Sequence, residues 1–303
     1  MNAPEKVRQY DRAAQTVGNI VHLEHFNVVI PDQRLATLFY VVGLGGTRDP
    51  YLFTGLENMW VNFGRTQCHL PSRAVPPRAE VLRGTVGLVV PSLDDLERRL
   101  THAGNEMKRV VPETKTKFAW ARVRDKGGDV VEATCPWGNR LRCHAPSPEF
   151  GRTELGIVYV DFDVPRGTAD GIARFYDQVM RAPASAEGGR AIVKVGQNQR
   201  LIFTDTDRPL PEYDNHHIQI YIADFSTPYE WLKARDLITM ETDANEWRFQ
   251  WITDPRDNRL LFQIEHEVRS MKHHLYARPL VNRNHGITNM TYQPGQDSFR
   301  GVY

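Results

Sequence analysis

The chain has 303 residues, of which 41% are hydrophobic and 25% are charged, so it is long enough to bury a normal core. A formal net charge of +1 gives no electrostatic footprint for nucleic acid or an anionic membrane. Three cysteines without C-x-x-C spacing argue against a disulfide framework and for a reducing compartment. No apolar run precedes Val21 and no stretch approaches the length of a membrane span, so we expect a cytoplasmic protein.

A similar segment occurs twice, at residues 25–46 and again at residues 159–182. Each copy reads as an alternating apolar strand, a short polar break and a helix that contains an aromatic pair. The pairs are Phe39-Tyr40 and Phe175-Tyr176. Duplication at this scale predicts a fold built by repetition of one unit.

The same order of elements can be followed along the whole chain. Apolar spacing and Gly/Pro breaks predict strands at 21–30, 85–90, 156–164 and 216–223, followed by helices at 34–42, 94–103, 170–180 and 228–235. Paired strands are predicted after each helix, at 57–70, 118–144, 191–204, and 247–253 with 260–268. The sequence therefore predicts an α+β fold of four βαβββ units.

The Pro- and Gly-containing segment 145–151 is the best linker, so we expect neighbouring units to pair into two domains. The predicted division is an arm at 1–20, domains at 21–145 and 152–268, and a tail at 269–303 that drapes over the surface. Corresponding positions of the four first strands hold His25, Thr85, Tyr159 and His217. Pairing two units closes a cup into which such positions converge.

These features resemble the vicinal oxygen chelate superfamily, which includes glyoxalase I, bleomycin-resistance proteins and type I extradiol ring-cleaving dioxygenases. The resemblance rests on the strand–Pro-Asp–helix start, on the turns CPWGN (135–139) and DPRDN (254–258), and on the number of units. It covers about residues 21–268, and the four-unit layout is most similar to the extradiol dioxygenases.

The resemblance implies a site for Fe(II), or another divalent metal, in the C-terminal domain. Those dioxygenases hold the ion through two His and one Glu, and carried over by position these are Tyr159, His217 and Glu265. Tyr159 stands where the family has His, so it is either a third ligand or a pocket residue. Asp161, on the same strand face, is another possible oxygen ligand.

Several neighbouring side chains are candidate partners of a small-molecule substrate. Tyr159, Asp161, Gln219 and Gln263 are candidate substrate contacts, and His216 and Tyr221 are candidate acids or bases. The leading hypothesis is a metal-dependent enzyme that resembles the ring-cleaving dioxygenases. The alternatives are a metal-free protein that binds a small ligand, favoured by the missing His, and an isomerase or lyase. A homo-oligomer is compatible with all three.

The N-terminal half offers a second constellation, formed by His25 on its first strand and His69 at the end of its first unit. In the pairing expected above, their partners would be Thr85 and Arg142. A guanidinium beside a cation is repulsive, so we expect this half to be structural and metal-free.

Overall fold

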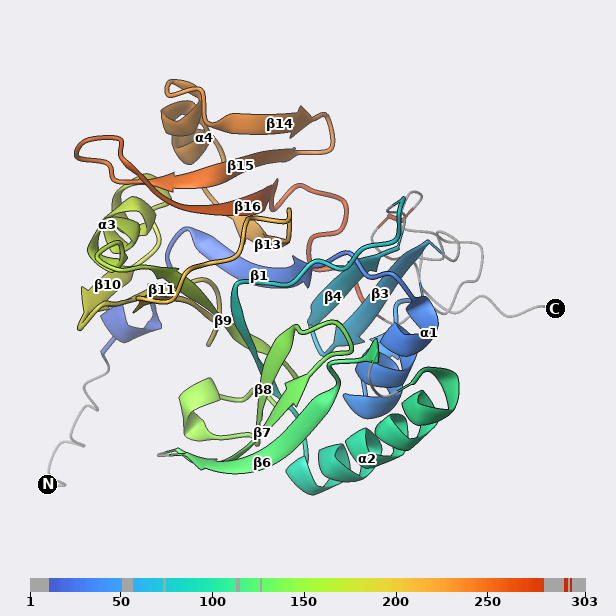
Figure 1. Ribbon diagram of the computed structural model, residues 1–303. Helices are drawn as coiled ribbons and strands as arrows, with labels where there is room; N and C mark the ends of the chain where they lie inside the picture. Colours follow the sequence, from blue (N-terminus) through green and yellow to red (C-terminus); the bar gives the residue numbers. More distant parts are fainter. Residues whose placement is uncertain are drawn as a thin grey trace, which may run out of the picture.

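The computed structural model describes residues 11–50, 57–72, 75–112, 115–125, 127–280, 292–293 and 295. The strands in these ranges form two eight-stranded mixed sheets (Figure 1). Sheet A contains, in spatial order, β14 (Ile238–Thr242), β15 (Glu246–Thr253), β16 (Leu260–Ser270), β13 (His217–Ile222), β1 (Ile20–Asn27), β4 (Thr66–Pro71), β3 (Asn58–Phe63) and β2 (Thr47–Arg48). Sheet B contains β10 (Ala184–Glu187), β11 (Arg190–Lys194), β12 (Arg200–Thr206), β9 (Gly156–Pro165), β5 (Gly84–Val89), β8 (Arg140–His144), β7 (Gly128–Thr134) and β6 (Ala119–Asp125).

The four predicted units are present, but they pair differently from the prediction. Strand β1 runs antiparallel to β13, which joins unit one to unit four, and β5 runs antiparallel to β9, which joins unit two to unit three. The chain passes from sheet A to sheet B between β4 and β5, and it returns to sheet A between β12 and β13 (Figure 1). The prediction that neighbouring units pair was wrong, and segment 145–151 connects two halves of sheet B. The four central strands have similarly apolar side chains, so the sequence does not indicate which of them pair.

The helices follow the predicted order. Helix α1 (Gln33–Ala36) begins where the Asp32 carboxylate accepts backbone N–H bonds, and it continues as a π-helical turn at Thr37–Gly43. Helix α3 (Ala169–Arg174) continues in the same way at Phe175–Val179, and both aromatic pairs are buried. Helix α4 spans Ser226–Lys233.

Helix α2 (Leu93–Val110) is longer than the predicted 94–103. The helix continues through Gly104, where a Cβ would lie only 2.8 Å from the ring of Phe118. Glycine is therefore used here for a close approach, and the Ser92 hydroxyl caps the first turn of the helix.

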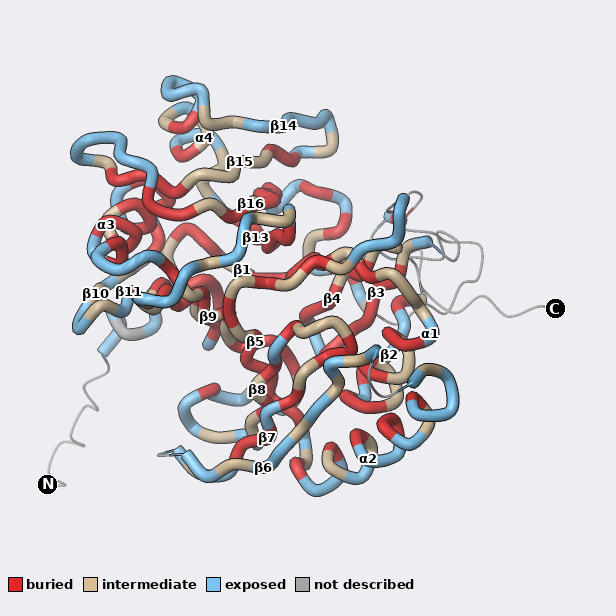
Figure 2. Tube along the Cα trace, in the orientation of Figure 1, coloured by how far each residue is buried: buried red, intermediate tan, exposed pale blue. Residues whose placement is uncertain are grey.

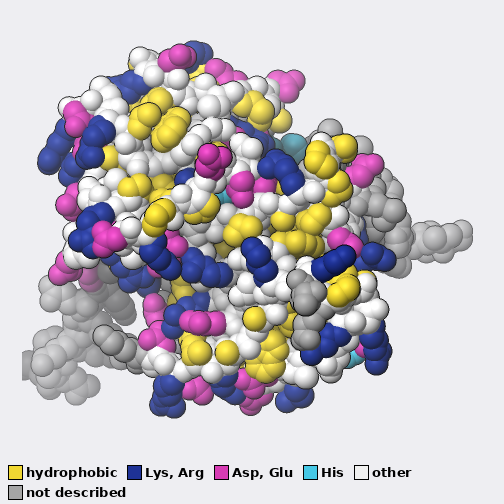
Figure 3. Space-filling view, viewed as in Figure 1, with side chains coloured by type: hydrophobic (Ala, Val, Ile, Leu, Met, Phe, Trp, Pro, Cys, Tyr) yellow, Lys and Arg dark blue, Asp and Glu magenta, His cyan; other side chains and the backbone are white. Residues whose placement is uncertain are grey.

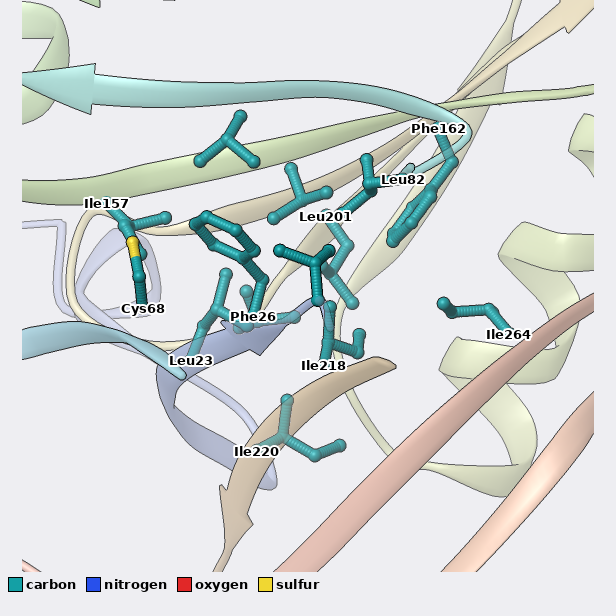
Figure 4. Close-up of a cluster of buried hydrophobic side chains, with 14 of the residues drawn as sticks. Leu23, Phe26, Cys68, Leu82, Ile157, Phe162, Leu201, Ile218, Ile220 and Ile264 are labelled. Atoms are coloured by element: carbon teal, nitrogen blue, oxygen red, sulfur yellow. The ribbon is translucent and has the colours of Figure 1, made fainter. Parts of the chain in front are cut away.

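The hydrophobic core lies between the two sheets. Apolar side chains of sheet A (Leu23, Phe26, Ile218 and Ile220) meet those of sheet B and its preceding loop (Leu82, Ile157, Phe162 and Leu201) in Figure 4. Figure 2 shows that the central strands are mostly buried, whereas β6 and β14 at the sheet edges are mostly exposed. Because side chains alternate along a strand, the central strands of sheet A turn a second set of residues to its opposite face.

The segment after β16 is more buried than predicted. His273, Leu275 and Arg278 are each at most 7% exposed, so residues 271–280 pack into the molecule and do not only drape over its surface. Acidic and basic side chains are interspersed on the face shown in Figure 3. Among the described residues, no helix is both long enough and apolar enough to cross a membrane.

Candidate metal centre

The face of sheet A that turns away from the core carries a layer of polar side chains. On β13, Ile218, Ile220 and Ile222 point into the core, so the alternate residues His217, Gln219 and Tyr221 lie on the polar face. On β16, Ile264 and Val268 are core residues, and Glu265, Glu267 and Arg269 occupy the polar face. We call this face, together with the corresponding face of β1, β3 and β4, the sheet A cup.

Three histidines from three adjacent strands meet in the sheet A cup. One ring nitrogen from each of His25 (β1), His69 (β4) and His217 (β13) lies within 4.8 Å of the other two. The ring centroids of His25 and His217 are 6.1 Å apart, and those of His25 and His69 are 5.8 Å apart. Glu267 adds a carboxylate, because its Oε2 lies 3.4 Å from His217 Nε2. The arrangement offers imidazole and carboxylate ligands from strands β1, β4, β13 and β16.

The tautomer of His25 is set by Glu24. Burial lowers the pKa of His25, so the imidazole is neutral, and its Nδ1 lies 3.1 Å from the Glu24 carboxylate. Burial alone would raise the pKa of Glu24, but the hydrogen bond from His25 and the Arg269 charge bring it down to about 2. The ionised Glu24 therefore accepts the Nδ1–H. This leaves a lone pair on His25 Nε2, which is buried and has no hydrogen-bond partner in the described part of the chain.

His69 is held more tightly than the other two histidines. Its Nδ1 accepts from the Asn27 amide at 2.5 Å, its Nε2 donates to Asn58 Oδ1 at 2.6 Å, and its ring stacks on Trp60 at 3.7 Å. Burial, followed by the neighbouring His25 and His217, lowers the pKa of His69 well below its usual value. His69 is therefore a neutral candidate ligand. To bind an ion through Nδ1 it would have to give up its hydrogen bond with Asn27.

Two carboxylates on β16 lie beside His217. The predicted ligand Glu265 has its Oε1 3.6 Å from His217 Nδ1 and accepts hydrogen bonds from Arg248 and Gln250. Glu267 is only 3% exposed and approaches the other imidazole nitrogen, Nε2, which has no hydrogen-bond partner. Burial opposes ionisation of Glu267, but Arg269 and then His217 hold its pKa well below the usual value. Sequence reasoning missed Glu267, although it shares the strand face of Glu265.

An ion-pair network surrounds the histidines. Arg269 contacts Glu24 and Glu246 at 3.4 and 3.2 Å and also pairs with Glu267. Arg248 contacts Glu246, Glu265 and Glu267 at 2.7–2.9 Å. Burial would lower the pKa of Arg269, but the surrounding carboxylates raise it well above its usual value. Both guanidinium groups are therefore committed to carboxylates.

Tyr159 and Asp161 do not join this site. They lie on β9 in sheet B, where the Tyr159 hydroxyl lies 2.9 Å from His144 Nε2 and Asp161 accepts from Thr204 at 2.8 Å. Both line a cavity of about 900 Å³ over sheet B whose lining includes none of the three histidines. The prediction that Tyr159 shares an ion with His217 was wrong, because unit three pairs with unit two.

The other predicted residues are distributed as follows. Gln219 is completely buried in the sheet A cup, and both of its amide atoms lack a partner. The Tyr221 hydroxyl lies 3.4 Å from Glu24, and the Gln263 amide donates to Gln250 at 3.2 Å. His216 lies one residue outside β13, and its Nδ1 is 2.5 Å from Asp214, so it is tied to the loop before the strand.

Further candidate ligands lie beside His25 and His69, in contrast to the expected pairing of units. Unit four, rather than unit two, stands beside unit one, so His217 and Glu267 take the places that Thr85 and Arg142 were expected to fill. Thr85 and Arg142 lie in sheet B, and Arg142 pairs there with Asp125 and Glu132. The expectation that His25 and His69 belong to a half without ligand partners was therefore wrong.

The tail covers part of the sheet A cup. The Tyr276 ring lies 5.0 Å from that of Tyr221, and Arg278 Nη2 contacts Asp49 Oδ2 at 2.7 Å. Arg278 also donates to Gln67 at 3.5 Å, and Gln67 shares the strand face of His69. Residues 271–280 therefore contact the same face of sheet A that carries the histidines.

Comparison with solved structures places this fold. A proposed dioxygenase from Bacillus subtilis aligns with a TM-score of 0.57 and 14% identity, over 90% of each chain. Glyoxalase I from Zea mays aligns with a TM-score of 0.59 and 13% identity, over 85% of this chain and 97% of that one. No protein-family model and no curated protein matches the sequence. The chain therefore has the fold of these two proteins, the glyoxalase/dioxygenase-like α+β fold that the sequence predicted.

Proposed function

We propose that the protein is a metal-dependent enzyme whose site is the histidine cluster of sheet A. The observation that carries the proposal is a pair of buried nitrogens, His25 Nε2 and His217 Nε2, which have no hydrogen-bond partner among the described residues and lie beside the ionised carboxylate of Glu267. Buried polar atoms without partners are costly, and together these three groups form a typical ligand set for a divalent ion. His69 would be a fourth ligand or a wall of the site.

The donor set favours Fe(II) among divalent metals. Two imidazoles and one carboxylate leave adjacent coordination positions open, which suits chelation of a substrate with two neighbouring oxygens. A bound ion would supply Lewis-acid polarisation of those oxygens, and iron would also support chemistry with O₂. The protein's own contribution is orientation: Glu24 fixes the His25 tautomer, while Arg269 and Arg248 hold Glu267 ionised.

We therefore propose a ring-cleaving dioxygenase that acts on a small substrate with vicinal oxygens, as a cytoplasmic protein. Isomerase or lyase chemistry at the same metal is the second candidate, supported by the fold shared with glyoxalase I. The metal-free binding hypothesis rested on Tyr159 replacing a ligand His. It loses that support because Tyr159 lies in sheet B.

Metal analysis of protein purified without a tag tests the proposal. We expect about one iron or other divalent ion per chain in wild type and in His102→Ala, which alters an exposed side chain of α2. We expect loss of that ion in His217→Ala with an unchanged circular dichroism spectrum. Wild-type protein that takes up no divalent ion when reconstituted would overturn the proposal. Oxygen uptake with a panel of catechols then separates the dioxygenase from the isomerase.

A further inference from the structure

Besides the candidate ligands, the sheet A cup contains other buried polar groups without partners. Gln219 is 0% exposed, and neither its amide nitrogen nor its amide oxygen has a hydrogen-bond partner among the residues that the structure describes. Trp60 Nε1 and Asn62 Nδ2 are also buried and unpartnered. Such orphaned groups are rare in folded proteins, so three within one cup call for a common explanation.

These groups stand around the candidate metal ligands. Gln219 follows His217 by two residues on the same strand face, and it is the register partner of His25 on β1. The Trp60 ring stacks on His69 and meets the His25 ring edge-on at 4.9 Å. Asn62 follows Trp60 by two residues on β3. A substrate that chelates an ion held by the histidines would therefore lie near Gln219 and Trp60.

The three groups without a hydrogen-bond partner, Gln219, Trp60 and Asn62, are uncharged. In the described part of the cup, Arg248 and Arg269 are each surrounded by three carboxylates, and Arg278 is paired with Asp49. A carboxylate or phosphate on the substrate would be desolvated here without a cationic partner, which is unfavourable. A hydroxyl or carbonyl group could bind the amide of Gln219, which both donates and accepts.

We propose that Gln219 and Trp60 recognise an uncharged hydroxyl or carbonyl substituent of the substrate, and that the site selects against substrates with an added carboxylate or phosphate. This inference deepens the proposed function and rests on it, because the substrate's chelating oxygens would bind an ion held by His25, His217 and Glu267. The amide and indole then satisfy their hydrogen bonds only when the ligand is bound. Gln219 is a specificity-determining residue in this assignment.

Two catechols that differ only in one substituent test whether the site selects against a carboxylate. Binding of 3,4-dihydroxybenzyl alcohol and of 3,4-dihydroxybenzoate to Fe(II)-loaded protein under argon is measured by calorimetry, after the iron content has been confirmed. We expect the alcohol to bind at least about tenfold more tightly than the carboxylate. Equal binding, or tighter binding of the carboxylate, overturns the inference while leaving the metal site intact. Protein without iron speaks against the proposed function instead.

The variant Gln219→Leu separates ligand recognition from a structural role. Because it removes an unsatisfied buried amide, we expect the ligand-free variant to melt at a higher temperature than wild type, and its affinity for the alcohol to fall about five- to tenfold. Gln263→Leu provides the contrast, since it breaks the hydrogen bond with Gln250 and should lower the melting temperature. A lower melting temperature in Gln219→Leu, with unchanged affinity for the alcohol, would show that an internal water satisfies this amide, and would overturn the inference.

Discussion

His25 and His217 stand side by side on antiparallel strands, with ring centroids 6.1 Å apart, although they belong to the first and the last unit of the chain. The candidate metal centre therefore forms where the first unit pairs with the fourth. Each of the two strands contributes an imidazole whose Nε2 has no hydrogen-bond partner among the described residues, and Glu267 Oε2 lies 3.4 Å from that of His217. Variants of the residues around these two histidines can test whether they hold a metal ion.

The two carboxylates of β16 should differ in their effect on metal binding. We expect Glu267→Gln to weaken the affinity for a divalent ion by about 100-fold or more, because a neutral amide replaces an anionic ligand. Glu265→Gln is the matched control, since Glu265 lies beside His217 Nδ1 and not beside the Nε2 that Glu267 approaches, so this variant should retain most of the affinity. Competition with a chromogenic chelator measures both variants. A larger loss in Glu265→Gln would restore the ligand predicted from the sequence.

Glu24 should make stability depend on pH in the acid range. Its pKa is about 2 in the folded protein and near 4.5 when unfolded, so its contribution to stability is complete above about pH 5 and is lost as the pH falls toward 2. A shift of this size corresponds to at most about 3 kcal/mol. Urea unfolding of metal-free protein between pH 7 and pH 3 should show a smaller decline in Glu24→Gln. Identical declines in wild type and variant would contradict this assignment.

The order of elements could be predicted from the sequence, but the pairing of units could not. Alternation along β13 and β16 correctly placed His217 and Glu265 on one face. Each unit begins with a similar central strand, so nothing local indicates whether β1 meets β5 or β13. That error led to the expectation that His25 and His69 bind no metal, and it gave Tyr159 a role that its place in sheet B does not allow. Glu267 could have been found, because it lies two residues beyond Glu265.

Tyr159 provides a direct check of the corrected pairing. Tyr159→Phe removes the hydrogen bond with His144 and should cost about 1 kcal/mol of unfolding free energy, with no change in metal stoichiometry. Chemical denaturation and metal analysis of the same preparation provide both quantities. Loss of the ion in this variant would mean that sheets A and B share a site after all.

The ion pair between Asp49 and Arg278 should anchor the tail over the sheet A cup. Both side chains are at most 1% exposed, so Arg278→Met leaves the Asp49 carboxylate buried without this partner and should destabilise the protein by about 3–5 kcal/mol. Adding Asp49→Asn to that variant should recover part of the loss, which a double-mutant cycle measures. If the tail also shields the site, Arg278→Met should release the bound ion to EDTA faster than wild type does. Protease cleavage of the tail reports whether Arg278→Met has loosened this segment. If cleavage becomes faster while the rate of ion release stays unchanged, the tail stabilises the fold without limiting access to the histidines.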